Sequence, residues 1–280
     1  KKLTLLEVVY TVLIAVYPIL SIYATFINNL SVADLLLIIL SIALTFEMLR
    51  KNKLFKLKHM QTFKIFLLYI LFSFAIQFIA GTGVGFLSTI RYLLYLYCLI
   101  SFSSVFNFSL GIKVLELFAI ASSVYLIIQF IALRFFSVVL PWHLPLKVID
   151  QNFDSLVGST YYLEYHRPTG FFYEPTHFSQ YCLIYLAYLL FLSEGKGKWV
   201  KVIITYVAIL CSGSSAGLFM VAILFALFLL ENLFNGKKMF QSLAIILLAL
   251  IGFLVILNIP YFSTIVNRVF ANGGFSGTAV

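Results

Sequence analysis

Charged side chains are scarce in this sequence. Only 10% of its 280 residues are charged and 62% are hydrophobic, whereas soluble globular proteins carry about 25% charged residues. The mean hydropathy is +1.06. So few charges cannot cover a globule with a hydrated surface, which excludes an ordinary soluble domain. The sequence therefore predicts an integral membrane protein.

The common nucleotide and metal signatures are also missing. The sequence contains no G-x-x-x-x-G-K-[ST], no G-x-G-x-x-G, no H-E-x-x-H and no paired C-x-x-C. These absences argue against an ATP-driven pump domain, a Rossmann module for nucleotide sugars and a membrane zinc protease. The three cysteines, Cys98, Cys182 and Cys211, lie in apolar runs and are predicted to be buried thiols. Because no cluster of acidic ligands occurs, we expect no metal and no cofactor.

Apolar runs dominate what is present. A helix needs about 20 mostly apolar residues to cross a bilayer. The sequence predicts an all-α, polytopic membrane helix bundle that forms a single domain over 1–280. The chain starts without Met and stops soon after a glycine-rich stretch, which suggests trimming at both ends. The nine expected spans are 4–27, 30–49, 63–80, 86–107, 112–134, 172–193, 199–212, 216–234 and 239–259.

The seventh and eighth spans are separated only by the turn Ser212-Gly213-Ser214-Ser215-Ala216-Gly217. One long helix over 199–234 would place the lysines before it and after it on opposite sides of the membrane. Two helices keep both lysine clusters on one side, as the positive-inside rule favours. The sequence therefore predicts two helices. The Ser/Gly turn either lines a substrate path or allows close helix packing.

Basic residues follow the predicted topology. With the N-terminus inside, fourteen of the nineteen lysines and arginines face the cytoplasm, so their excess indicates topology rather than a nucleic-acid partner. Four of the other five are arginines: Arg91, Arg134, Arg167 and Arg268. This bias indicates guanidinium chemistry on the outside, although Arg91 and Arg134 are also placed to snorkel to headgroups. The one long connection, 135–171, is predicted to be an external loop.

The most informative stretch runs from Arg167-Pro168-Thr169-Gly170-Phe171-Phe172-Tyr173-Glu174-Pro175 into the sixth span. Pro175 suits the first turn of a helix, and Glu174 lies at the positive end of that helix dipole. Glu174 and His177 are three residues apart and are expected to share a face that Tyr181 continues. The alternative is an ordinary carboxylate at a helix start with an interfacial histidine. Asp34 is interpreted as an ordinary acid in the first turn of its span.

That stretch, preceded by the Arg-bearing segment Thr89-Ile90-Arg91-Tyr92, resembles the Wzy-type O-antigen and capsular polysaccharide polymerases. The turn Cys211-Ser212-Gly213-Ser214-Ser215 is similar to the Ser-rich turn of that family. The resemblance implies a GT-C-like glycosyltransferase of the bacterial cytoplasmic membrane. It would transfer a glycan from undecaprenyl diphosphate to a hydroxyl of a lipid-linked repeat at the external face. The implied partners are this lipid-linked oligosaccharide, membrane lipid, a flippase and a chain-length regulator.

The resemblance and the chemistry assign the same site residues. Arginine matches phosphate oxygens and stays charged, so Arg91, Arg167 and Arg268 are predicted to hold the diphosphate. Glu174 is expected to be partly desolvated and to act as the general base, with His177 as the second candidate. Tyr161 and Tyr162, with Phe171 and Phe172, are expected to stack on sugars or to form an aromatic belt. Family members commonly have more spans and a second external loop with an essential arginine, for which Arg268 is the candidate here.

Three alternatives remain at this point. An O-antigen ligase shares the lipid donor, but the external histidines His143 and His166 are isolated. A lipid-linked oligosaccharide flippase or other transporter would favour cations deep in a cavity and an internal repeat. A non-catalytic membrane partner would leave the Arg and Glu-Pro loop unexplained.

Overall fold

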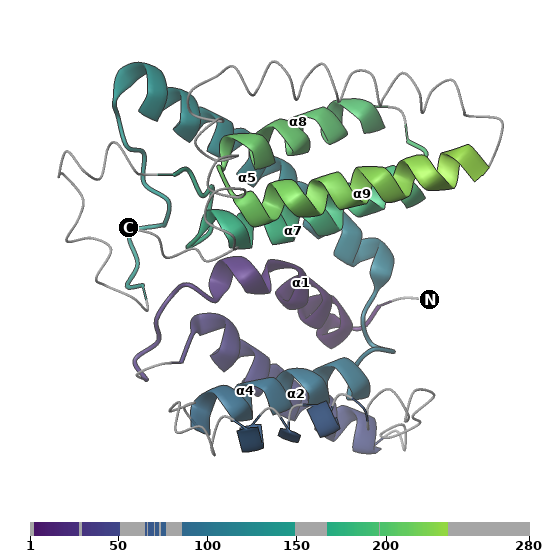
Figure 1. The fold of residues 1–280 in the computed structure, drawn as a ribbon. Helices are drawn as coiled ribbons and strands as arrows, with labels where there is room; N and C mark the ends of the chain where they lie inside the picture. The colour runs from purple at the N-terminus through teal and green to yellow at the C-terminus, as the bar shows by residue number, and fades with distance from the viewer. Residues whose placement is uncertain are drawn as a thin grey trace. The chain divides into compact units, whose positions relative to one another are not determined.

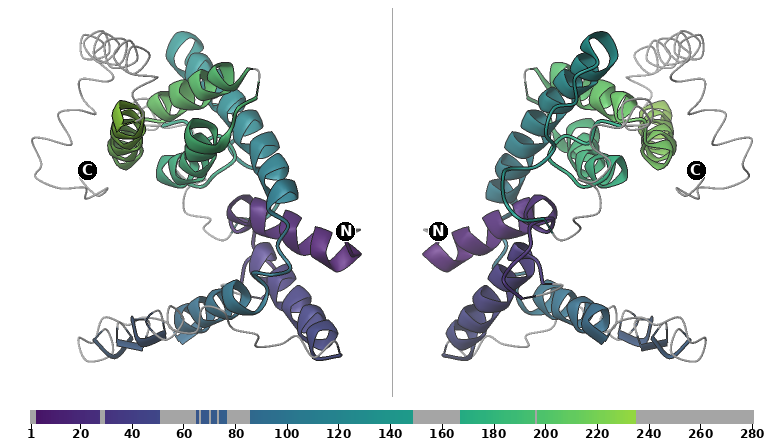
Figure 2. Two further views of the ribbon diagram at one scale, coloured as in Figure 1. Left: turned by 90° about the vertical axis from the view of Figure 1, so that its right-hand side faces the viewer. Right: turned by 90° about the vertical axis from the view of Figure 1, so that its left-hand side faces the viewer.

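The structure of the chain is a computed structural model. It describes residues 3–27, 30–50, 86–148, 167–195 and 197–234, with isolated residues between 65 and 76. The chain divides into two compact units (Figures 1 and 2). Unit 1 comprises Lys1–Val114 with Lys147–Ile149, and unit 2 comprises Leu115–Leu146 with Asp150–Val280. The prediction of a single transmembrane domain with an external loop over 135–171 stays a prediction.

The described residues are helical. They form no β-strand, and their extended pairings are two isolated bridges, Tyr23 with Val148 and Ala24 with Ser31. Within these ranges three helices are long and apolar enough to cross a membrane, namely α2 (Val32–Arg50), α5 (Phe108–Phe136) and the Ser215–Asn232 part of α9. The all-α membrane class is therefore supported, whereas the count of nine spans stays a prediction.

Unit 1 packs α1 (Leu5–Leu20), α2 and α4 (Phe86–Ser101) around one apolar core. Thr4 begins α1 with a capping box, in which the Thr4 hydroxyl accepts from the Glu7 amide and the Glu7 carboxylate accepts from the Thr4 amide. The tyrosine Tyr10 packs edge-on against Phe102, with ring centroids 5.7 Å apart. The buried core residues are Tyr10, Leu13, Leu37, Leu40, Leu44, Met48, Cys98 and Phe102.

Two helices of unit 1 are shorter than the spans predicted for them. The expected span 4–27 is wrong in its end, because α1 stops at Leu20 and the chain then turns through the Ala24–Ser31 bridge into α2. The expected span 86–107 ends at Ser101, and Asn107 caps α5 by accepting from the Leu110 amide at 2.9 Å. The sequence stays apolar through both turns, so hydropathy alone did not predict the residues at which these helices end.

Unit 2 contains most of α5, then α7 (Pro175–Ala187), the π-helical turn η2 (Tyr188–Leu192), α8 (Lys198–Cys211) and α9 (Ser215–Phe234). The helices α7, α8 and α9 lie side by side (Figure 1). The predicted division of 199–234 into two helices is confirmed. The break lies at Gly213, whose φ of 63° favours glycine. The expected span 239–259 lies outside the described residues.

The Ser/Gly turn serves helix packing. Ser212 and Ser214 are buried, and Ser214 accepts the Gly217 amide at 3.1 Å at the start of α9. A Cβ at Gly217 would lie 2.5 Å from the Ser179 Oγ on α7, so only glycine allows this approach of α9 to α7. Of the two interpretations of the turn, the structure supports close packing. The cysteines Cys98, Cys182 and Cys211 are buried and free, as predicted.

Substituting Gly217 tests this packing. We expect Gly217→Ala to destabilise the folded protein, because overpacking costs about 1–3 kcal/mol, more than the roughly 0.5–1 kcal/mol that alanine gains in a helix. Thermal unfolding of the purified protein in detergent measures the change. Gly195→Ala is the control, since the nearest atom to its added Cβ is 3.9 Å away.

The Ser179→Gly background removes the two atoms nearest to the new methyl group, Ser179 Oγ and Cβ. Gly217→Ala introduced into that background should no longer lower the unfolding temperature. An equal loss in both backgrounds would contradict the close α7–α9 contact.

Candidate functional site

The turn that precedes α7 is anchored to α5 by a single glutamine. Gly170 adopts a φ of 66°, and its amide donates to the Gln129 Oε1 at 2.9 Å. The Gln129 Nε2 donates to the Pro141 carbonyl at 3.1 Å and reaches the Gly170 carbonyl at 3.4 Å. Gln129 is 4% exposed, so this amide links two segments of the predicted external loop to one helix.

Aromatic packing completes the turn. Phe172 is fully buried and contacts Phe178 and Tyr181, with ring centroids 5.9 Å and 5.1 Å away. Phe171 stacks on Tyr125 of α5 at 4.9 Å. The expectation that Phe172 stacks on a sugar is therefore wrong, because Phe172 belongs to the core of unit 2. The neighbouring Tyr173 packs edge-on against Trp142 at 5.6 Å.

Glu174 and His177 lie on the surface of unit 2. Glu174 is the N-cap residue of α7 with extended backbone, and its side chain makes no capping hydrogen bond. Both side chains are exposed, whereas Tyr181 is buried against Phe172. Tyr181 follows His177 by one turn of α7, as predicted, but it is buried and does not extend the exposed surface that Glu174 and His177 form. In the described part of the chain the Glu174 side chain is exposed, whereas the sequence predicted it to be partly desolvated.

Arg167 connects the loop to the break between α8 and α9. Its Nη1 donates to the Gly213 carbonyl at 3.4 Å. The Ser212 hydroxyl beside it donates to the Ile209 carbonyl at 2.7 Å and contacts the Ser179 hydroxyl at 3.3 Å. Three segments therefore meet at this end of unit 2, namely the start of the 167–174 turn, the second turn of α7 at Ser179 and the α8–α9 break.

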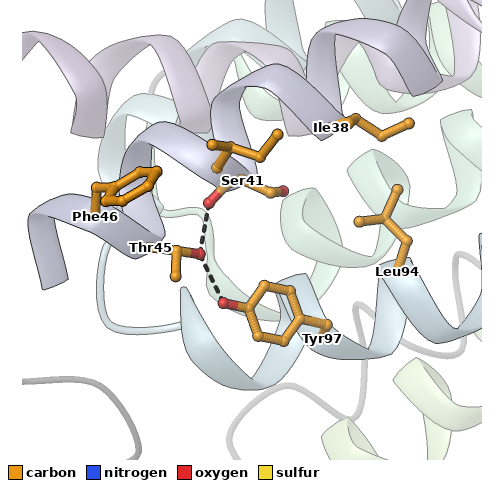
Figure 3. A pocket seen from close by; sticks show the side chains of 7 residues that line it. Ile38, Ser41, Thr45, Phe46, Leu94 and Tyr97 are labelled. Atoms are coloured by element: carbon orange, nitrogen blue, oxygen red, sulfur yellow. Dashed lines mark hydrogen bonds between the residues drawn. The ribbon is translucent and has the colours of Figure 1, made fainter. Parts of the chain in front are cut away.

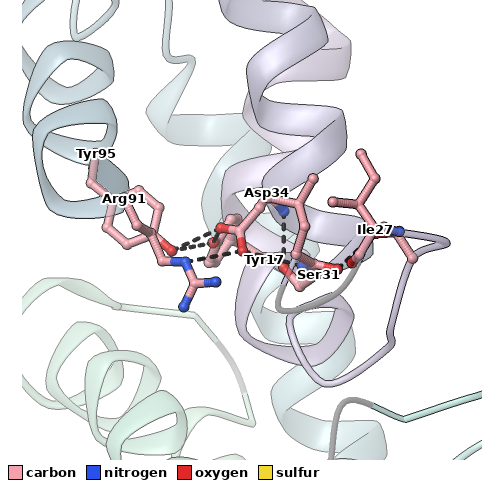
Figure 4. Close-up of polar contacts among 8 residues, drawn as sticks. Tyr17, Ile27, Ser31, Asp34, Arg91 and Tyr95 are labelled. Carbon is pink, nitrogen blue, oxygen red and sulfur yellow. Dashed lines mark hydrogen bonds and ion pairs between the residues drawn. The ribbon is translucent and has the colours of Figure 1, made fainter. Parts of the chain in front are cut away.

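A second polar cluster lies in unit 1 (Figure 4). The Asp34 Oδ2 forms an ion pair with the Arg91 Nε at 3.1 Å, and the Asp34 side chain is 3% exposed. The Asp34 Oδ1 accepts from the Tyr95 hydroxyl at 2.9 Å and from the Tyr17 hydroxyl. The interpretation of Asp34 as an ordinary first-turn acid is therefore incomplete, because α1 and α4 both bond to it.

The predicted site residues fall into three groups. Glu174 and His177 lie at the start of α7 and Arg167 at the start of the turn before it, all in unit 2, whereas Arg91 lies in unit 1. Tyr161, Tyr162 and Arg268 lie outside the described residues. Their roles as substrate-binding or catalytic residues stay predictions. Within the described ranges, no group of three or more His, Cys, Asp or Glu side chains is placed to hold a metal ion.

Sequence reasoning missed Gln129 and undervalued Asp34. Both are polar side chains inside long apolar runs, and such residues usually face a protein interior and bond there. That signal was present in the sequence. Their hydrogen-bond partners could not be predicted, because the partners are distant in sequence. Gln129 and Gly170 are 41 positions apart, and Asp34 and Tyr95 are 61 apart.

Comparison with known proteins found no relative of this chain. No protein-family model, no curated protein and no solved structure matches this chain.

Replacing Gln129 tests whether it holds the turn. We expect Gln129→Leu to destabilise the protein by about 1–3 kcal/mol. The buried Gly170 amide loses its acceptor, and the Pro141 carbonyl loses one of its donors. Thermal unfolding in detergent reports the loss, and protease cleavage within the loop should become faster. Gln180→Leu is the matched control, since Gln180 is exposed on α7. Equal stability of the two variants would contradict the anchoring role.

Proposed function

We propose that this protein is a membrane glycosyltransferase that polymerises lipid-linked oligosaccharide repeat units. The donor is a glycan chain on undecaprenyl diphosphate, and the acceptor is a hydroxyl of the next lipid-linked repeat. The observation that carries this proposal is the ordered turn before α7. Arg167 lies at the beginning of this turn and Glu174 at its end, and Gln129 fixes Gly170 between them. A cation and a carboxylate carried by one fixed turn suit transfer from a diphosphate.

Arginines stabilise the leaving group in this reaction. The bond between the anomeric carbon and the diphosphate oxygen breaks, and the diphosphate departs with the electron pair. Positioned cations near such developing charge lower the barrier by several kcal/mol. We assign this role to Arg167 and, through the resemblance, to Arg91 and Arg268. Because the guanidinium is planar and permanently charged, lysine is a poor replacement.

Glu174 is the proposed general base. The acceptor hydroxyl forms the new bond to the anomeric carbon, and its proton passes to the Glu174 carboxylate, with His177 as the second candidate. The side chain is exposed on the protein itself. Exclusion of water from it therefore has to come from the bound lipid-linked substrates, since closing a site over a base removes its hydration. Tyr161 and Tyr162 would contact the sugars.

The cellular setting follows from the same proposal. The protein would lie in the bacterial cytoplasmic membrane with its N-terminus inside and the start of α7 at the external face. The apolar helices α2, α5 and α9 are long enough for a membrane. A flippase that delivers repeats and a protein that limits chain length are the partners that this reaction requires.

Polymerisation in reconstituted vesicles tests the proposal. Purified protein supplied with undecaprenyl-diphosphate-linked repeat units should produce a ladder of longer lipid-linked chains on a gel. Arg167→Ala and Glu174→Gln should each lower the rate by at least about 100-fold, because general acid–base catalysis contributes about 10²–10⁴-fold and a positioned charge-stabilising donor a similar factor.

Two matched substitutions serve as controls. Arg134→Ala removes another exposed arginine, and Glu194→Gln neutralises an exposed glutamate beyond the other end of α7. Both should leave the ladder unchanged. Normal ladders from Arg167→Ala and Glu174→Gln would overturn the proposed site, and no elongation by the wild-type protein would overturn the proposed function.

A further inference from the structure

The helix α7 is held in unit 2 by one of its sides. Phe178, Cys182 and Leu186 are fully buried, and they are four residues apart, so they lie on one side of the helix. The Cys182 Sγ lies 3.7 Å from the hydroxyl of Ser123 on α5. The core of unit 2 therefore fixes the rotation of α7 about its own axis, and with it the residues that the opposite side exposes.

The opposite side of α7 is uncovered. It carries His177, Gln180 and Ile184, which are separated by three and then four residues and are all exposed. Glu174 precedes them as the exposed N-cap residue. We call the surface formed by these four side chains the α7 face. It is polar from Glu174 to Gln180, over about 9 Å at 1.5 Å per residue, and becomes apolar at Ile184, which is 62% exposed.

Gln180 is the unexpected member of the α7 face. It lies inside the predicted span 172–193, where polar side chains normally point into the protein and bond there. The Gln180 side chain is instead exposed, and it forms no hydrogen bond within the part of the chain that the structure describes. Its amide has two donor hydrogens and an acceptor oxygen. A polar ligand satisfies such an amide, whereas lipid hydrocarbon does not.

The apolar groove between α2 and α4 in unit 1 shows the contrast (Figure 3). Its volume is about 240 Å³, and its lining includes the polar residues Ser41, Thr45 and Tyr97. The Thr45 hydroxyl donates to the Ser41 carbonyl at 2.7 Å and lies 2.6 Å from the Tyr97 hydroxyl. The polar atoms of the groove are therefore paired with one another, and it offers hydrocarbon contact. The α7 face offers hydrogen bonds.

Charge limits the polar ligands that suit the α7 face. The sequence from Glu174 to Ile184 contains one carboxylate and no lysine or arginine. A phosphate headgroup would meet a like charge at Glu174, which is unfavourable. Sugar hydroxyls, in contrast, donate to a carboxylate or an amide oxygen and accept from an amide nitrogen. The face therefore matches an uncharged, hydroxyl-rich ligand better than a phospholipid headgroup.

We propose that the α7 face binds the acceptor sugar of the lipid-linked repeat and that Gln180 is a substrate-binding residue. This inference rests on the proposed function, in which an acceptor hydroxyl lies at Glu174. A sugar that presents one hydroxyl to Glu174 places its other hydroxyls along the helix toward Gln180. Ile184 marks the inner limit of the sugar, since its side chain makes no hydrogen bond. The diphosphate lies off this face, because the face has no cation.

A binding measurement on the full-length protein in detergent tests the proposal. The probes are the undecaprenyl-diphosphate-linked repeat unit and undecaprenyl diphosphate without sugar. Wild-type protein should bind the sugar-bearing lipid more tightly. Gln180→Leu should weaken that binding about 2- to 12-fold, which corresponds to a net hydrogen bond of about 0.5–1.5 kcal/mol. Its affinity for the sugar-free lipid should be unchanged, whereas Arg167→Ala should weaken both lipids.

The controls separate sugar binding from a structural role of Gln180. Ser109→Leu also replaces an exposed polar side chain of a helix by leucine, on α5, and should leave both affinities unchanged. Gln180→Asn keeps the amide on a shorter side chain, so it should recover part of the preference for the sugar-bearing lipid. Gln180→Leu should unfold at the wild-type temperature, because the side chain is exposed.

Three results would overturn the proposal. These are equal affinity of wild-type protein for the two lipids, an unchanged preference in Gln180→Leu, and equal competition by phosphatidylglycerol, which would indicate a site for bulk-lipid headgroups. The assay measures no transfer, so its failure is distinguishable from failure of the proposed polymerase activity. Elongation by wild-type protein together with normal sugar binding by Gln180→Leu would refute the role of Gln180 alone.

Discussion

Burial of polar groups in an apolar chain is the constraint on which the rest of this structure depends. A buried donor or acceptor without a partner costs about 1–3 kcal/mol, and a chain with 10% charged residues has few partners to offer. Each unit contains one buried polar side chain that bonds to several segments. In unit 1 the Asp34 carboxylate bonds to α1 and α4 as well as to α2. In unit 2 the Gln129 amide bonds to the turn before α7 and to Pro141.

An arginine lies close in space or in sequence to what each of these side chains bonds. Asp34 pairs with Arg91 directly, while Gln129 fixes Gly170, three residues after Arg167. An oriented guanidinium stabilises a departing diphosphate better than a mobile one, because it needs no reorganisation during the reaction. In the proposed reaction the same bonds that stabilise the two units also hold their cations ready. In that proposal, structural and catalytic requirements would be met by the same residues.

The features that could be predicted from the sequence are those encoded locally. Long apolar runs indicated the all-α membrane class, and small residues at 212–217 indicated the break between α8 and α9, where Gly213 adopts a positive φ. Helix ends were less accurate, because hydropathy continues past Leu20 although the backbone turns there. The burial of Phe172 and the partners of Gln129 depend on contacts between distant segments. No pattern within one span encodes such contacts.

The most direct measurement is a gel of surface and lipid-linked glycan from a strain that lacks this protein. A polymerase acts after the repeat unit has reached the external face and before the chain is delivered to its final acceptor. The proposed function therefore predicts that single repeats reach the surface and that the ladder of longer chains disappears. An unchanged ladder would contradict it. Full-length chains retained on the carrier lipid would instead identify a ligase, and repeats trapped on the inner leaflet a flippase.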